Sequence, residues 1–211
     1  NDGNTSLFNT KEFGIEGSIF FPQFLSPIKL KKFTTEYQPR TTLTVGYNLQ
    51  ARPIYTRQIT LLTFGYNWMK NKYEQHILTP ITLNSVKVEP TPSFEAILEQ
   101  ETNQRIKDQY TSHLIFGLDY TYIYNNQNVR FLNDFFYFKA NIQSSGNLLS
   151  AFNNTSIIKT IDNYHEIFGI RYAQYLRFAF RFRYFKYVAR ENRIATRLML
   201  GAGIPFGNSN D

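Results

Sequence analysis

The sequence predicts an all-β fold, an antiparallel transmembrane β-barrel with a short helical insert. Apolar and polar residues alternate with the strand period of two over eight segments of the chain. Several of these segments are ten to twelve residues long, and about ten residues tilted at roughly 45° cross the hydrocarbon core of a bilayer. The 211 residues include 20 Phe and 15 Tyr, so the apolar half of the pattern is largely aromatic.

The first half of the chain contains four predicted strands, at 12–21, 41–51, 59–68 and 76–88. Short connections at 52–55 and 69–73 favour hairpins between neighbouring strands. In the fourth strand the alternation runs through Ile77, Ile81 and Leu83 and then loses phase near Ser85, which predicts a β-bulge there. The apolar face of the second and third strands carries Leu43, Val45, Tyr47, Leu62 and Phe64.

A helical insert near residues 92–107 follows the fourth strand. Thr91 is placed to cap the helix, Pro92 suits its first position, and Phe94, Ile97 and Leu98 share one face. Residues 146–152 predict a further helical turn within the long connection 144–170.

The second half of the chain contains the other four strands, at 114–124, 135–143, 175–186 and 194–206. The segment 175–186 alternates most clearly, because its aromatic residues oppose Arg177, Arg181 and Arg183. A short turn at 189–192 joins it to the last strand. The apolar face of these strands carries Phe116, Leu118, Phe136, Phe138, Phe178, Phe180, Phe182, Leu198 and Leu200.

The volume of the apolar side chains indicates that they face lipid. The apolar faces carry more than thirty large side chains, whereas a small eight-stranded barrel encloses roughly a dozen. The opposite, charged face is therefore expected to line a watery interior. Its basic wall consists of Lys139, Arg177, Arg181, Arg183 and Arg197. Aromatic residues near strand ends are expected at the membrane interface, namely Tyr66, Trp68, Tyr122, Tyr124, Tyr184 and Tyr187.

Several functional classes are disfavoured by composition and motifs. A net charge of +7 is compatible with binding to nucleic acid. However, the arginines and the aromatic rings are expected on opposite faces of the strands, so they could not contact one ligand together. No nucleic-acid partner is therefore predicted. The chain has no cysteine, and its three histidines are scattered, so no metal site is predicted. Gly201-Ala-Gly203 lacks the rest of a phosphate-binding fingerprint. We predict no catalytic residues and no cofactor.

A series of short segments occurs in an order that can be compared with known barrels. They are Pro39-Arg40-Thr41 followed by Val45-Gly-Tyr-Asn48, Arg52-Pro-Ile-Tyr-Thr-Arg57, Phe64-Gly-Tyr-Asn-Trp68, His76-Ile-Leu-Thr-Pro-Ile81, Pro92-Ser-Phe-Glu95, Tyr122-Ile-Tyr-Asn-Asn-Gln127, Ser145-Gly-Asn-Leu-Leu149 and Gly201-Ala-Gly-Ile-Pro-Phe-Gly207. Together they resemble the barrel of the BamA/TamA family of bacterial surface antigens. The resemblance is to the Bacteroidota branch of that family, called TamL or BamA-like, and it covers nearly the whole chain.

The resemblance implies an integral outer-membrane protein that assembles, inserts or translocates other proteins. Its expected partners are lipopolysaccharide and phospholipid, unfolded outer-membrane proteins, and other subunits of the assembly machinery. Such barrels have sixteen strands, so residues 1–211 are expected to form about the third through tenth, a partial barrel without the periplasmic POTRA domains and the C-terminal strands. The family's inward-folded loop with an Arg-Gly-aromatic motif is absent too, and the basic wall is expected to meet an acidic group on it.

Two alternatives remain open from the sequence. The eight strands could close into a small structural or adhesive outer-membrane barrel. A soluble lipid- or ligand-binding β protein is the third class, and it would require the chain to remain monomeric without detergent.

Overall fold

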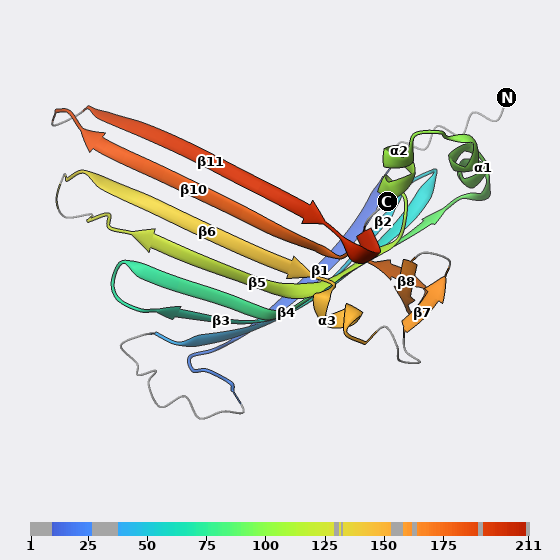
Figure 1. Cartoon of the computed structure of the whole chain (residues 1–211), viewed down its shortest axis with the longest axis horizontal. Helices are drawn as coiled ribbons and strands as arrows, with labels where there is room; N and C mark the ends of the chain where they lie inside the picture. The colour runs from blue at the N-terminus through green and yellow to red at the C-terminus, as the bar shows by residue number, and fades with distance from the viewer. Residues whose placement is uncertain are drawn as a thin grey trace.

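The computed structural model describes residues 10–26, 38–128, 131, 133–152, 158–161, 164–189 and 192–209. Eight long strands form one antiparallel sheet in which each strand pairs with the next (Figure 1). They are β1 (Lys11–Phe21), β2 (Arg40–Ala51), β3 (Tyr55–Met69), β4 (Glu74–Pro90), β5 (His113–Asn125), β6 (Phe135–Ser145), β10 (Tyr175–Tyr187) and β11 (Arg193–Pro205). All eight predicted strands are confirmed, with bounds that agree to within four residues.

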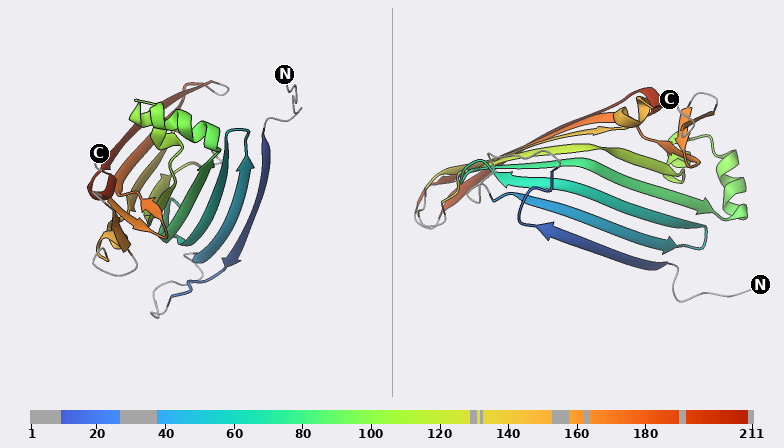
Figure 2. Two further views of the ribbon diagram at one scale, coloured as in Figure 1. Left: turned by 90° about the vertical axis from the view of Figure 1, so that its right-hand side faces the viewer. Right: turned by 90° about the horizontal axis from the view of Figure 1, so that it is seen from below.

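The sheet curves into an open trough and does not close on itself (Figure 2). Among the described residues, β1 pairs only with β2, and β11 pairs only with β10. Both outer strands therefore present a free edge. A closed barrel is thus not what the described chain forms, although the curvature runs in one sense from β1 to β11.

The two ends of the trough differ. One end, which we call the turn end, carries the short turns 70–73 and 188–192 and the connections 22–39 and 126–134. The other, the insert end, carries the tight β2–β3 turn and both long insertions, as Figure 1 shows.

The insertions contain the remaining elements. The first holds α1 (Pro92–Gln100) and α2 (Gln104–Gln109), which confirms the predicted helical insert and Pro92 at its start. Thr91 occupies the N-cap position, but its hydroxyl donates to the carbonyl of Ile54 at 3.2 Å and does not cap the helix. The second insertion holds α3 (Asn147–Ser150), β7 (Ile158–Ile161), β8 (Tyr164–Ile167) and β9 (Ile170–Tyr172), and the turn η2 (Gly207–Ser209) follows β11.

Of the buried hydrophobic side chains in the described ranges, all but Phe135 belong to two small clusters, both at the insert end. On one face of the sheet, Tyr55, Val86 and Val88 pack with Tyr110 from the helical insert. On the other, Leu114 packs with Ile158, Ile167 and Tyr172. Strand β9 pairs in parallel with the start of β5, in the place that β6 leaves when it ends. The two insertions thus anchor one end of the sheet, and its long middle has no such core.

The bulge in β4 lies at Pro80, so its predicted position near Ser85 is wrong. The register of β4 shifts between Thr79 and Thr82 against β5, and at the same level against β3. Proline has no N–H to donate to a strand ladder, which makes position 80 the natural site for the irregularity. The shift also places Ile77 on the polar face, opposite Thr121, whereas Ile81 lies on the apolar face.

Asn208 ties the end of β11 to the second insertion. Its side-chain oxygen accepts a hydrogen bond from the His165 N–H at 2.6 Å, and its amide nitrogen donates to the carbonyls of His165 and Tyr172. Its backbone carbonyl accepts two bonds from Arg171, and its backbone N–H donates to the side chain of Gln174. Asn208 is only 4% exposed, so these bonds form away from water.

We expect Asn208→Ala to lower the free energy of unfolding by about 2–3 kcal/mol, because buried backbone groups at His165 and Tyr172 lose their partners. The urea midpoint of the refolded protein measures the effect. Asn192→Ala is the matched control, because Asn192 is exposed and its side chain has no hydrogen bond within the described ranges. Equal midpoints for the two variants would contradict the role of Asn208.

Candidate functional site

Over most of its length the sheet has one apolar face and one polar face. At the insert end of β3 and β4 this division is lost, because Lys87 and Glu89 lie on the side of the apolar face. The strand registers place every residue predicted to face lipid on the apolar face: Leu43 lies opposite Phe64, Phe182 opposite both Phe138 and Leu198. Many of these side chains are open to the surroundings, with Val45 53% and Leu200 60% exposed. Contiguous apolar surface of this extent marks a protein or membrane contact on a folded protein.

Aromatic rings form a belt on the apolar face at the turn end. Trp68 stacks on His76 with ring centroids 5.1 Å apart, and Phe24 meets both Tyr66 and Trp68 edge-on. Contacts continue across β5, β6 and β10 through Tyr122, Tyr124, Phe136, Phe138 and Phe182. Rings with a polar atom at one edge suit the boundary between apolar and aqueous surroundings.

Two of the predicted interfacial tyrosines end up on different faces. Tyr184 lies on the apolar face opposite Phe136, where its hydroxyl donates to Asp134 at 3.1 Å. Tyr187 lies on the polar face opposite Arg193, so it is not part of the aromatic belt. The reason is that the two tyrosines are three positions apart, an odd number, and successive strand residues point to opposite faces.

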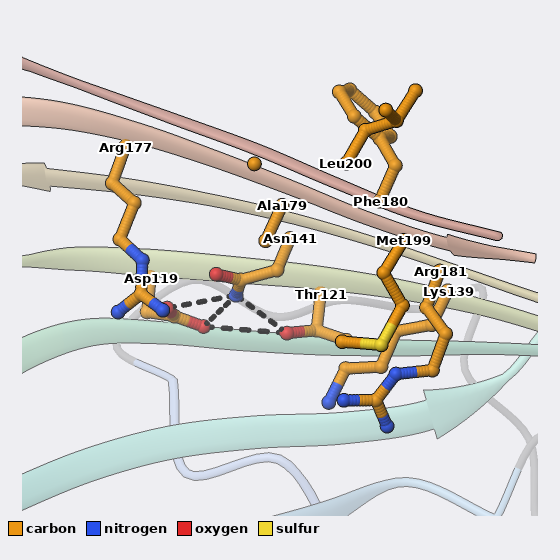
Figure 3. A pocket seen from close by; sticks show the side chains of 11 residues that line it. Asp119, Thr121, Lys139, Asn141, Arg177, Ala179, Phe180, Arg181, Met199 and Leu200 are labelled. Atoms are coloured by element: carbon orange, nitrogen blue, oxygen red, sulfur yellow. Dashed lines mark hydrogen bonds between the residues drawn. The ribbon is translucent and has the colours of Figure 1, made fainter.

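The polar face carries the predicted basic residues, which the registers bring together on β6, β10 and β11. Arg181 lies directly opposite Lys139, and Arg183 lies directly opposite Arg197. We call Lys139, Arg177, Arg181, Arg183 and Arg197 the basic row. Figure 3 shows Arg177, Arg181 and Lys139 on the side of the sheet opposite to Phe180 and Leu200. These three basic residues line a hollow of about 560 Å³.

Asp119 lines the same hollow and is held by neutral groups. The side-chain amide of Asn141 donates to both carboxylate oxygens of Asp119, at 2.9 and 2.8 Å, and to the hydroxyl of Thr121 (Figure 3). The Thr121 hydroxyl also donates to Asp119, at 3.4 Å. The sequence singled out neither Asn141 nor Thr121, because their meeting depends on the register between β5 and β6.

The basic row has no acidic partner among the residues that the structure describes. The two ion pairs found there are Lys70–Glu74 and Lys87–Glu89, away from the row. The Nε atoms of Arg181 and Arg183 are buried and have no hydrogen-bond partner in the described part of the chain. Arg183 lies over the ring of Tyr137, 5.6 Å from its centroid.

Acidic residues occupy the polar face at the opposite edge of the sheet. Glu12 on β1 accepts hydrogen bonds from the side chains of Asn48, at 2.8 Å, and Gln50, at 3.4 Å, both on β2. Glu16 lies opposite Gly46 on the same face. The polar face is therefore acidic at the β1 edge and basic at the β11 edge.

The described residues hold no group of three or more histidine or acidic side chains placed to bind a metal ion. Within the same ranges no helix is long and apolar enough to span a membrane.

The fold and the two faces define a curved antiparallel sheet with one exposed apolar surface and one charged surface. Compared with protein-family models, curated proteins and solved structures, the chain matches none of them.

Proposed function

We propose that the sheet is part of the wall of an integral outer-membrane β-barrel of the BamA/TamA type, which assembles or translocates other outer-membrane proteins. The observation that carries the membrane part of the proposal is the exposed apolar face, bordered at the turn end by the aromatic belt and backed by a charged face. Lipid on one side and water on the other satisfy both faces at once.

The stagger of the strands supports a tilted barrel wall. A row of residues that face one another from strand to strand starts at the turn end of β1 and finishes close to the insert end of β11. Its members are directly paired except at the bulge, where Gly65 lies beside Thr79. The row runs through Phe20, Thr42, Gly65, Thr79, Asp119, Gln143, Arg177 and Gly203. Closing a sheet into a barrel requires strands tilted by about 35–45° and an accumulated offset of this kind.

The two free edges of the sheet favour a barrel that contains more strands than these eight. Each unpaired backbone group in hydrocarbon costs several kcal/mol, so β1 and β11 need hydrogen-bonding neighbours if the sheet lies in a bilayer. We propose that additional strands supply them, which makes the eight strands one part of a larger barrel. The hydrogen-bonding edges of such a barrel can also pair with strands of incoming proteins.

The assembly role rests on the resemblance of the ordered segments to the BamA/TamA barrels. Its partners would be lipopolysaccharide and phospholipid around the apolar face, unfolded outer-membrane proteins as clients, and other assembly subunits. Depleting the protein in the bacterium that makes it should lower the amount of folded, heat-modifiable outer-membrane barrels, and re-expression should restore it. Unchanged barrel levels after verified depletion would contradict the assembly role.

One observation favours a second candidate, a closed eight-stranded structural or adhesive barrel. Strands β1 and β11 run antiparallel, and setting Phe20 opposite Arg193 would bring Glu16 opposite Arg197 on the polar face. On the apolar face the same register would bring Ile15 opposite Leu198. Opposite charges and apolar pairs across strands are stabilising, so the two edges are complementary.

A cysteine pair at Ser18 and Ala195 distinguishes the two candidates, since these positions would face each other in the closed register. The chain has no native cysteine, so the pair is the only one present. We expect no intramolecular disulfide under mild oxidation of the folded protein, because other strands separate β1 from β11 in the larger barrel. Efficient formation of that disulfide would establish the small closed barrel.

A further inference from the structure

We propose that the basic row binds an acidic segment of polypeptide in extended conformation, with carboxylates on alternate residues. The inference deepens the proposed function and rests on it, because the polar face must line the interior of the barrel. It concerns the ligand of the hollow beside β10, which is lined by three basic residues and one carboxylate, that of Asp119.

The first step is the shape of the row. Arg177, Arg181 and Arg183 lie on one face of β10, and at about 3.3 Å per residue they extend over roughly 20 Å. Lys139 and Arg197 flank this line from the neighbouring strands. A single phosphate or sulfate spans only a small part of that length. A strand-like segment presents side chains of one face at about 7 Å intervals, which matches Arg181 and Arg183.

The second step is the charge. Like charges directly opposite each other on a sheet are destabilising, and the row contains two such pairs, Arg181 with Lys139 and Arg183 with Arg197. Asp119, the acidic residue that lines the hollow, already accepts hydrogen bonds from Asn141 and Thr121. The cations therefore need negative charge from outside the described sheet.

The third step is the chemistry of the donors. A guanidinium offers planar donors that fit a carboxylate in a bidentate manner, and the Nε atoms of Arg181 and Arg183 have no acceptor in the described chain. Nucleic acid also carries anions, but its bases need aromatic platforms beside the cations. The aromatic belt lies on the other face of the sheet. On the polar face, Arg183 lies over the ring of Tyr137, and Phe135 and Phe185 stack on each other. These rings already have partners, so we assign acidic polypeptide to the row.

Charge reversal at Arg181 gives opposite results with and without such a segment. With an acidic segment bound, Arg181→Glu places a carboxylate against carboxylates, and we expect the heat-modification midpoint of the full-length protein to fall by about 5 °C or more. Without one, the new glutamate faces Lys139 and forms a cross-strand ion pair, so the midpoint stays equal or rises. An equal or raised midpoint would overturn the inference. Lys72→Glu in the exposed 70–73 turn makes the same change of charge as a control.

A photo-crosslinker at Met199, which lines the hollow, identifies the occupant. We expect crosslinked peptides with Asp or Glu on alternate residues, and about tenfold less crosslinking in Arg181→Glu/Arg183→Glu. Neutral peptides, an unchanged yield in that variant, or displacement by millimolar inorganic phosphate alone would each overturn the inference. Phe180→Arg on the apolar face separates failure of this inference from failure of the barrel proposal. If the barrel proposal is wrong, Phe180→Arg does not reduce folding. If only this inference is wrong, Phe180→Arg still reduces folding.

Discussion

Arginine in place of Phe180 should cost the folded protein about 2–4 kcal/mol in a bilayer, the penalty for a basic side chain facing lipid near the membrane centre. Phe180 lies near the middle of β10, opposite Ala140 and Leu200, and is 41% exposed. On a water-soluble sheet an exposed phenylalanine tolerates this change. The fraction of heat-modifiable, folded protein recovered from membranes measures the effect.

Ala179→Arg is the matched control for that variant. Ala179 is the adjacent residue of β10 and lines the hollow on the polar face, so a watery interior should accept the same side chain with little loss of folded protein. Equal folding of the two variants would contradict the assignment of the apolar face to lipid. Loss of folding in both would show that β10 tolerates no bulk on either face.

Gly117→Ala should be the most damaging change of a single methyl group in the sheet. A Cβ at Gly117 would overlap the backbone carbonyl oxygen of Ser144 and lie 2.8 Å from the Cα of Ser145. Both contacts are backbone, at the point where β5 exchanges its neighbour β6 for β9, so relief requires movement of a strand. We expect a loss of about 3 kcal/mol, the upper part of the usual range for overpacking.

Gly203→Ala provides the comparison, because a Cβ at Gly203 has no atom within 4 Å. Both glycines lie on the polar face of long strands, and neither has a positive φ. Unfolding midpoints in urea should therefore separate the two variants clearly. If Gly117→Ala unfolds at the same urea concentration as Gly203→Ala, the close approach of β6 to β5 at this point is wrong.

Period-two alternation was sufficient to locate all eight long strands, because apolar and polar residues alternate over most of each strand. In β4 the alternation changes phase at the bulge. The short strands β7, β8 and β9 were not predicted, since three or four residues hold too few alternations to distinguish a strand from a loop. The bulge was misplaced by a few residues for a related reason. A shift of phase is visible only after several more residues, whereas Pro80 marks the irregularity itself.

The sequence was sufficient to predict which residues of the candidate site lie on the polar face, but not which side chains they contact. Parity put Arg177, Arg181 and Arg183 on one face from the sequence alone. The bonds from Asn141 to Asp119, and the position of Lys139 opposite Arg181, depend on the register between strands, which is determined by connection lengths and by the bulge. The prediction for Tyr187 rests on its position near a strand end, whereas the register shows that its side chain is on the polar face.

The most direct test of the central claim is a nitroxide scan along β10 in the full-length protein reconstituted in lipid vesicles. The chain has no cysteine, so single cysteines at positions 176–184 carry the label without background. We predict that even positions are accessible to molecular oxygen dissolved in the bilayer and odd positions to a water-soluble nickel complex, with strict alternation. Access of the nickel complex to Phe178, Phe180 and Phe182 as free as to Arg177 and Arg181 would contradict a membrane wall.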